Sequence, residues 1–238
     1  MNKTSRARQR RIPVHELQHS AITPYSLGYS YPGRPEVATS PDTVLCFGPF
    51  WTHATEFPRN TTPRVIGRPR VMDAELSRGG VRRPRHVLVI SQSVLGQALL
   101  TLVARAAALA PDYRFVFRPH PSELESDLHG SLAAAGLALP ANLSIVSGGE
   151  PLYRQLAEAA LQVGVFSTGL FEGMTLGCRT IVADLPGAEA MGAVIERGDA
   201  LLVETPEDLA AALPRAPIAK PNDYYAEPVA SILQLLDS

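Results

Sequence analysis

The sequence contains few cysteines, few aromatic residues and no excess of charge of either sign. Its two cysteines, Cys46 and Cys178, are far apart and belong to no metal-binding motif. This argues against a disulfide scaffold or a zinc site and favours a reducing, cytoplasmic location. Lys and Arg total 22 against 23 for Asp and Glu, so the chain lacks the positive field of a nucleic-acid-binding protein. We therefore expect no nucleic-acid partner, no metal ion and no other cofactor.

A long hydrophobic run is also missing. The most apolar stretch, residues 94–110, is interrupted by Gln97 and Arg105 and is shorter than the ~20 residues that cross a bilayer. It predicts a buried helix of a soluble protein. The first eleven residues are rich in Lys and Arg, and we expect a solvated, disordered tail at 1–11, with contact to an anionic membrane or nucleic acid as the alternative. No apolar stretch follows the tail, which argues against a secretory signal and leaves at most peripheral membrane association.

From residue 85 onward, short β-branched runs alternate with longer stretches rich in Ala and Leu, a pattern typical of βαβ units. The expected strands are residues 86–91, 113–118, 143–146, 161–166, 180–184 and 200–204. The expected helices are residues 94–110, 123–135, 151–160, 168–177, 188–197 and 206–213. Together they predict an α/β fold with a Rossmann-like, doubly wound parallel sheet that is covered on both faces.

The first 80 residues differ, being rich in Pro and Gly. Their brief strand-like runs are residues 12–17, 43–47 and 64–66. We interpret residues 1–80 as the tail of a preceding domain with an interdomain connection, and residues 81–238 as a Rossmann-like domain. Residues 223–236 predict a final amphipathic helix.

A basic and an imidazole side chain follow the strand expected at 113–118, in the segment Arg118-Pro119-His120-Pro121-Ser122-Glu123. The two prolines restrict the loop backbone, so the loop presents its side chains repeatably. The planar guanidinium of Arg118 suits a phosphate, and His120 can donate a proton to a departing phosphate oxygen. The alternative is a polar turn in which His120 bonds to a backbone carbonyl.

Two hydroxyl residues and a glycine, Ser167-Thr168-Gly169, follow the strand expected at 161–166 and open a helix. Their hydroxyl and backbone N–H groups would face an anion at the positive end of the helix dipole. Simple N-capping is the alternative. Glu172 has no Ser or Thr spaced to form a capping box with it, and we expect it to bind a ribose diol.

Small polar residues follow the first strand of the same domain. Ser91 and Gln92 are expected to contact the bound nucleotide, or else to cap the helix after them. The glycine pattern GxGxxG is absent there, which argues against NAD or FAD. His19 closes the strand-like run at 12–17 and is expected to act as a base or acceptor contact, with a surface histidine as the alternative.

These segments resemble the carboxyl-terminal half of GT-B glycosyltransferases of bacterial surface-polysaccharide synthesis, including capsule, sialyltransferase-like and CDP-glycerol transferase-like groups. The Arg118 to Glu123 segment resembles the family's His-Pro motif, and Ser167-Thr168 its Ser-Ser or Ser-Thr motif. Glu16 to Ser20 resembles a Gln-His-Gly element near the end of the first domain. The resemblance implies that the paired motifs bind the donor's nucleotide phosphate, that His120 assists the leaving group and that Glu172 contacts the ribose.

The sequence thus predicts a cytoplasmic, metal-independent GT-B glycosyltransferase, or its donor-binding half. It would transfer a sugar from a CMP-, CDP- or UDP-linked donor to a surface-polysaccharide acceptor. The expected catalytic residues are His120 and His19. The expected donor-binding residues are Ser91, Gln92, Arg118, His120, Ser167, Thr168, Gly169 and Glu172. A nucleotide-sugar epimerase is one alternative, and a non-catalytic, truncated or split nucleotide-binding subunit with an acceptor-domain partner protein is the other.

Overall fold

The computed structural model of the 238-residue chain describes residues 4, 6–7, 10–70, 72, 74, 81–220 and 222–232. The chain divides into two compact units. Unit 1 consists of Met1–Asp73 together with Pro221–Ser238, and unit 2 consists of Ala74–Lys220.

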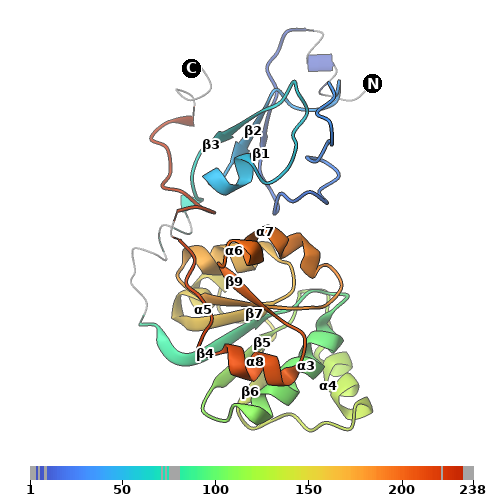
Figure 1. The fold of residues 1–238 in the computed structure, drawn as a ribbon, viewed down its shortest axis with the longest axis vertical. Helices are drawn as coiled ribbons and strands as arrows, with labels where there is room; N and C mark the ends of the chain where they lie inside the picture. Colours follow the sequence, from blue (N-terminus) through green and yellow to red (C-terminus); the bar gives the residue numbers. More distant parts are fainter. Residues whose placement is uncertain are drawn as a thin grey trace. The chain divides into compact units, whose positions relative to one another are not determined.

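Unit 2 is built on a six-stranded sheet in which every strand pairing is parallel (Figure 1). The strands are β4 (Arg83–Ile90), β5 (Arg114–Arg118), β6 (Leu143–Ile145), β7 (Ala159–Gly164), β8 (Arg179–Ala183) and β9 (Ala200–Val203). Their order across the sheet is β6-β5-β4-β7-β8-β9. This is the 3-2-1-4-5-6 order of a Rossmann sheet, and its direction of growth reverses between β4 and β7.

Helices cover both faces of this sheet. They are α3 (Gly96–Leu109), α4 (Glu125–Ala134), α5 (Leu152–Glu158), α6 (Thr168–Thr175), α7 (Gly192–Glu196), α8 (Pro206–Ala212) and the short 3-10 helix η2 (Ala188–Met191). One layer contains α3, α4 and α8, and the opposite layer contains α5, α6 and α7 (Figure 1). The double cover explains why consecutive residues of the central strands, 87–90 in β4 and 115–117 in β5, are all buried.

A buried polar side chain fixes α6 to the sheet. Gln162 in β7 is fully buried, and its Nε2 donates to the Leu170 carbonyl in the first turn of α6 at 2.6 Å and to Thr180 Oγ1 in β8 at 2.8 Å. A Cβ on Gly173 would lie 2.0 Å from Gln162 Oε1, so the helix approaches this amide through a glycine. The start of α6 is therefore held at one place above the sheet.

The secondary structure predicted for the α/β part is confirmed in type and order. Each expected strand coincides with one of β4 to β9, and each expected helix with one of α3 to α8, with ends that differ by a few residues. The helix expected at 188–197 is divided into η2 and α7. The interruption coincides with Gly192, a residue with low helix propensity.

Unit 1 contains a three-stranded parallel sheet of order β1-β2-β3. The strands are β1 (His15–Leu17), β2 (Thr43–Cys46) and β3 (Thr62–Val65), and they coincide with the three strand-like runs of the sequence. The 3-10 helix η1 (Pro49–Thr52) follows β2 and buries Trp51.

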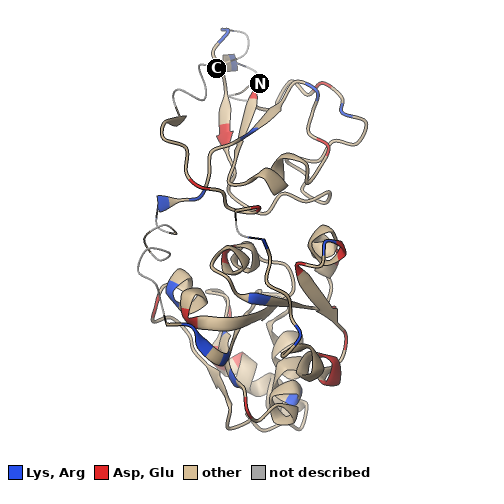
Figure 2. Cartoon of the chain, turned by 60° about the vertical axis from the view of Figure 1, so that its left-hand side comes forward, with Lys and Arg blue, Asp and Glu red and all other residues tan. Residues whose placement is uncertain are grey.

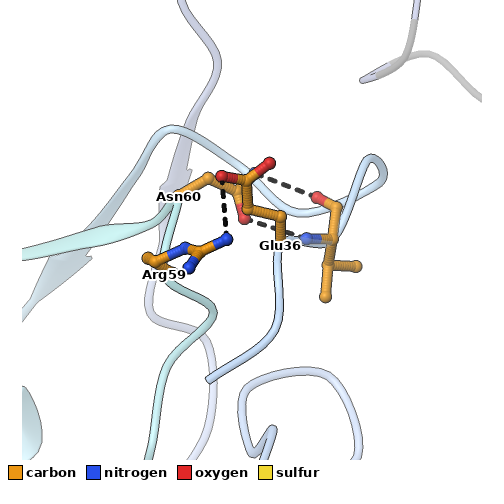
Figure 3. A network of polar contacts seen from close by, with 4 residues as sticks. Glu36, Arg59 and Asn60 are labelled. Atoms are coloured by element: carbon orange, nitrogen blue, oxygen red, sulfur yellow. Dashed lines mark hydrogen bonds and ion pairs between the residues drawn. The ribbon is translucent and has the colours of Figure 1, made fainter. Parts of the chain in front are cut away.

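Side chains fasten the connection between β2 and β3 to the chain before β2. Asn60 Oδ1 accepts from the Val37 N–H at 2.9 Å, and Asn60 Nδ2 donates to the Val37 carbonyl at 3.0 Å (Figure 3). Beside them, Arg59 Nη2 lies 3.2 Å from Glu36 Oε1. The two hydrogen bonds of the Asn60 side-chain amide order a loop segment that has no regular secondary structure.

The helix predicted for residues 223–236 is wrong over residues 223–231. Residues 222–231 form turns, bends and irregular chain, Ile232 is helical, and 233–236 lie outside the described residues. Trp51 Nε1 donates to the Tyr224 carbonyl at 2.6 Å, and the Ala226 N–H donates to the Phe47 carbonyl at 2.9 Å. Tyr224 and Tyr225 are buried in the core of unit 1. Their burial outweighs the helical pattern of the sequence, which Pro228 already weakens.

This packing also changes the predicted division of the chain. Residues 222–232 associate with unit 1 and not with the Rossmann-like part, to which the sequence-based boundary of 81–238 had joined them. No helix in the described ranges is long and apolar enough to cross a membrane. The tail expected at 1–11 falls in part on residues outside the described ones and stays a prediction.

The variant Gly48→Ala tests the packing of the C-terminal segment on unit 1. Gly48 has an extended backbone with φ −156°, so alanine adds no backbone strain, but its Cβ would lie 2.4 Å from the Asp223 carbonyl oxygen. We expect a loss of about 1–3 kcal/mol in the free energy of unfolding of unit 1, the usual cost of overpacking. Urea denaturation measures this loss, and limited proteolysis at residues 222–232 measures the release of the segment.

Gly28→Ala is the matched control, because a Cβ on Gly28 would meet nothing within 4 Å. Equal stability of the Gly48→Ala variant and the wild type would contradict the packing described for unit 1.

Candidate functional site

The segments singled out in the sequence lie at one edge of the unit 2 sheet. β4 pairs with β5 on one side and with β7 on the other, all in parallel, so the residues that follow these three strands emerge at the same edge. Main-chain and side-chain contacts join them there. The Ser91 N–H donates to the Arg118 carbonyl at 3.1 Å, and Gln92 Oε1 accepts from the Phe166 N–H at 3.1 Å. This edge, at the reversal of strand order, is where ligands bind in open α/β sheets.

Glu123 connects the loop after β4 to the loop after β5. Its Oε1 accepts from Ser91 Oγ at 3.0 Å and its Oε2 accepts from the His120 N–H at 2.5 Å. The carboxylate lies against the start of α3, where a Cβ on Gly96 would be 1.6 Å from Oε1. Any side chain at position 96 would displace Glu123. Glu123 is therefore a positioning residue for both Ser91 and His120.

His120 is exposed, and its tautomer follows from its neighbours. The Ser122 N–H donates to Nδ1 at 3.2 Å, and Ser122 Oγ lies 2.8 Å from the same nitrogen. A backbone N–H can only donate, so Nδ1 accepts and the neutral ring carries its proton on Nε2. Within the described residues no group accepts from Nε2 and no backbone carbonyl accepts from the ring. The geometry thus presents an N–H donor to the solvent at this edge.

Arg118 is half-buried and bonded to the chain after β6. Its Nη1 donates to the Glu150 carbonyl at 2.9 Å and to Gln155 Oε1 at 2.8 Å. Both contacts use one nitrogen of a group that has five N–H donors. These contacts hold the side chain in place, and binding of an anion by its other donors stays a prediction.

Ser167 is the N-cap of α6. Its Oγ accepts from the Gly169 N–H at 3.2 Å, which confirms the capping that the sequence allowed. Thr168, the first residue of the helix, is half-buried, and its hydroxyl makes no hydrogen bond in the described part of the chain. Capping thus accounts for one of the two hydroxyls, while the other is available at the positive end of the helix dipole.

Glu172 lies one turn further along α6 and is largely buried. The hydroxyl of Tyr153 in α5 donates to its Oε1 at 3.2 Å. Burial raises the pKa of Glu172, and the Tyr153 hydrogen bond lowers it by less. Burial and the nearby Glu172 carboxylate together raise the pKa of Tyr153 to about 12. The Glu172 carboxylate is largely shielded from water and accepts one hydrogen bond from the protein. It can therefore accept another from a ligand hydroxyl.

His19 belongs to unit 1, where it follows β1. Its Nε2 lies 3.6 Å from Glu16 Oε1, with both side chains well exposed, and its ring centroid is 5.9 Å from that of Tyr29. Gln18 beside it is buried, and its Oε1 accepts from the Phe47 N–H at 2.9 Å. Gln18 therefore has a structural role, and the catalytic role of His19 stays a prediction.

Several contacts of the site have only weak signals in the sequence. The contact of Glu123 with Gly96 in the first turn of α3 is one of them. Glycine in a helix is costly, so its presence indicates the close approach of another group. The partnership of Tyr153 with Glu172 has no local signal, because it depends on how α5 packs on α6. The described residues contain no group of three or more His, Cys, Asp or Glu side chains arranged to hold a metal ion.

Comparison with known proteins defines the fold class. No protein-family profile matches the chain, and no curated protein matches it in sequence. The structure of CalG4, the calicheamicin glycosyltransferase, matches with a TM-score of 0.55 and 19% identity over 89% of this chain and 61% of that chain. The UDP-GlcNAc 2-epimerase of Methanocaldococcus jannaschii matches with a TM-score of 0.60 and 11% identity over 97% of this chain and 72% of that chain.

A third structure is HepE of Anabaena in complex with UDP and glucose, with a TM-score of 0.50 and 15% identity over 87% of this chain and 62% of that chain. The chain thus spans about three fifths of the length of CalG4 and of HepE. At these identities the likeness establishes the fold alone. The chain has the Rossmann-like, parallel-sheet α/β fold of GT-B glycosyltransferases, which confirms the predicted fold class.

The buried carboxylate of Glu172 predicts a pH-dependent stability. Because the pKa of Glu172 is raised in the folded state above the usual 4.5, the stabilisation from its neutral form is complete below about pH 4.5 and is lost as the pH rises through the folded pKa. Glu172→Gln keeps the acceptor for Tyr153 and removes the charge. We expect its midpoint of thermal unfolding to exceed that of the wild type by a margin that grows from pH 4 to pH 7, reaching about 2 °C or more.

Differential scanning calorimetry over this pH range measures the margin. Glu196→Gln serves as the control, because Glu196 is exposed in α7. A margin that shrinks as the pH rises would contradict the burial of the Glu172 carboxylate.

Proposed function

We propose that the chain is the donor-binding half of a GT-B glycosyltransferase, which binds a nucleotide-activated sugar for transfer to a surface polysaccharide. The observation that carries this proposal is the meeting of three loops at the switch point of the sheet: Ser91-Gln92, the His120 loop and the Ser167 helix start. The fold of HepE, whose structure contains UDP and glucose, supports a nucleotide sugar as the ligand class.

Each residue has a stated part in the proposal. The N-terminus of α6 receives the phosphates through the Thr168 hydroxyl and the N–H groups around Gly169, and the positive end of the dipole offsets the charge without a metal ion. The Nε2–H of His120 donates to the phosphate oxygen that departs from the sugar.

The remaining contacts concern position and the nucleoside. Arg118, already fixed by Gln155, directs its other donors to the phosphates. Glu172 accepts from the ribose hydroxyls. The loop of Ser91 and Gln92 borders the same ligand from the β4 side.

Turnover would also need an acceptor site. In this proposal His19 contacts the acceptor or acts as base, and the glycan acceptor is bound by unit 1 or by an acceptor-domain partner protein. The reaction would take place in the cytoplasm, with at most peripheral association with the membrane.

A nucleotide-sugar epimerase is the second candidate. The match to the M. jannaschii UDP-GlcNAc 2-epimerase, with its TM-score of 0.60 and 97% coverage of this chain, favours it at the level of the fold. Both candidates use the same nucleotide site. They differ in whether an acceptor is needed.

The donor-site proposal predicts nucleotide binding that depends on His120 and Ser167. We expect isothermal titration calorimetry to detect binding of at least one of CMP, CDP and UDP, and each of His120→Ala and Ser167→Ala to weaken it by about tenfold. His120→Ala removes a hydrogen bond to a charged group, and Ser167→Ala removes the cap that orders the first turn of α6, where the phosphates are received; each loss corresponds to about tenfold in affinity. Absence of any binding at millimolar nucleotide would disprove the donor site.

The matched controls are His129→Ala and Ser126→Ala, which remove the same side chains from exposed positions on α4. Both should bind nucleotide as the wild type does. Equal losses in these controls would show a general loss of folding and count against the assigned roles.

Product analysis separates the remaining candidates. We expect no change in a UDP-sugar incubated with the chain alone, and formation of a glycoside when a suitable acceptor is added. An epimer formed without acceptor would favour the epimerase. Nucleotide binding with neither product would favour the non-catalytic, split or truncated subunit.

A further inference from the structure

A separate pocket of unit 2 lies at the opposite edge of the sheet, where the strands begin. Its volume is about 380 Å³. It is lined by Arg82, Pro84, Arg85, Tyr113, Ala160, Leu161 and Arg179. These residues lie just before or at the start of β4, β5, β7 and β8. Because the strands are parallel, this arginine pocket and the loops of Ser91, His120 and Ser167 are at opposite ends of the sheet.

Two guanidinium groups of the arginine pocket are held by backbone carbonyls. Arg82 donates to the carbonyls of Ala159 and Leu176. Arg179 Nε donates to the Ala216 carbonyl at 2.5 Å, and its Nη2 donates to the Pro214 carbonyl at 2.6 Å.

Among the residues that the structure describes, no carboxylate pairs with Arg82 or Arg179. Carbonyl oxygens satisfy N–H groups without cancelling a full charge. Both positive charges therefore stay available to an anion, and both groups are already ordered, which reduces the entropy lost on binding.

The third arginine of the pocket has an unusual backbone. Arg85 has φ +64°, a left-handed conformation that is uncommon for residues other than glycine, and the ladder between β4 and β7 shifts register between Arg83 and Val87. Irregularities of this kind redirect side chains next to functional sites. Arg85 Nη1 lies 3.5 Å from Asp112 Oδ2, with both side chains mostly exposed. Such a pair is weak, so a ligand can replace Asp112.

Two further arginines at this edge, Arg83 and Arg114, act on a neighbouring histidine. His86 follows Arg85 in β4, and its pKa is lowered, first by burial and then by the charges of Arg83 and Arg114. Glu158 acts on the pKa of His86 in the opposite direction with a smaller effect, and it also forms an ion pair with Arg83 at 2.9 Å. The Lys and Arg residues that the structure describes in this unit are blue in Figure 2.

We propose that the arginine pocket binds a phosphate group, at a site separate from the proposed nucleotide-sugar site. Guanidinium forks match phosphate oxygens in geometry and charge, and the three arginines come from the starts of β4 and β8, which lie on either side of β7. The ring of Tyr113 and the side chains of Pro84 and Leu161 supply an apolar wall for the organic part of a phosphate ester. A soluble phosphate ester and the headgroup of an anionic lipid share this chemistry.

Inorganic pyrophosphate is the first probe. Calorimetric titration is done in a chain that carries His120→Ala and Ser167→Ala, so that the proposed nucleotide site contributes little. We expect saturable binding that Arg85→Gln weakens about fivefold or more, while Arg85→Lys, which keeps the charge but not the fork, weakens it less. Arg105→Gln, the same change at an exposed position of α3, should leave the affinity within about twofold.

Vesicles are the second probe and distinguish the two sources of phosphate. Sedimentation with phosphatidylglycerol vesicles, but not phosphatidylcholine vesicles, that is lost in Arg85→Gln and kept in Arg105→Gln identifies a lipid headgroup. Pyrophosphate binding without vesicle binding identifies a soluble ligand. Failure of the chain to bind either probe, or equal losses in Arg85→Gln and Arg105→Gln, overturns the proposal. Unchanged thermal unfolding of Arg85→Gln establishes that a loss of binding is not a loss of folding.

Discussion

The pairing of β4 with β5 on one side and β7 on the other is the constraint on which the rest of unit 2 depends. All three strands run in the same direction, so their carboxyl ends form one edge and their beginnings form the other. The first edge gathers the loops of Ser91, His120 and Ser167, although these lie up to 76 residues apart in the sequence. The second edge gathers the arginines. A parallel sheet thus places the loops of the proposed nucleotide site and the arginine pocket at opposite ends of its strands.

Hydrogen bonds beyond the strands extend this order into the loops. Glu123 accepts from both Ser91 and His120, and Gln92 reaches the main chain after β7. Gln162 in β7 holds the first turn of α6 through its hydrogen bond to the Leu170 carbonyl. The donors at the edge are therefore ordered before any ligand arrives, and a bound anion would lose less of its binding free energy to ordering the protein.

Two carboxylates at the same edge are in opposite situations. Glu123 has a donor on each oxygen, which suits a purely structural role. Glu172 is largely buried with one phenolic donor, and burial raises its pKa. An incompletely satisfied buried carboxylate costs stability, and such costs are commonly found where a residue serves a ligand. Under the proposed function, the ribose hydroxyls supply the donors that Glu172 lacks.

The sequence by itself determined the strands and helices of unit 2, the fold class and the edge at which the motifs lie, because hydrophobic periodicity and helix-boundary residues act locally. It failed at residues 223–231, where a weak helical pattern yields to burial of Tyr224 against Trp51 in unit 1. Only the tertiary structure decided the partners of Glu172 and Arg118, the tautomer of His120 and the existence of the arginine pocket. These depend on contacts between elements distant in the sequence, and no local pattern of residues encodes the packing that brings such elements together.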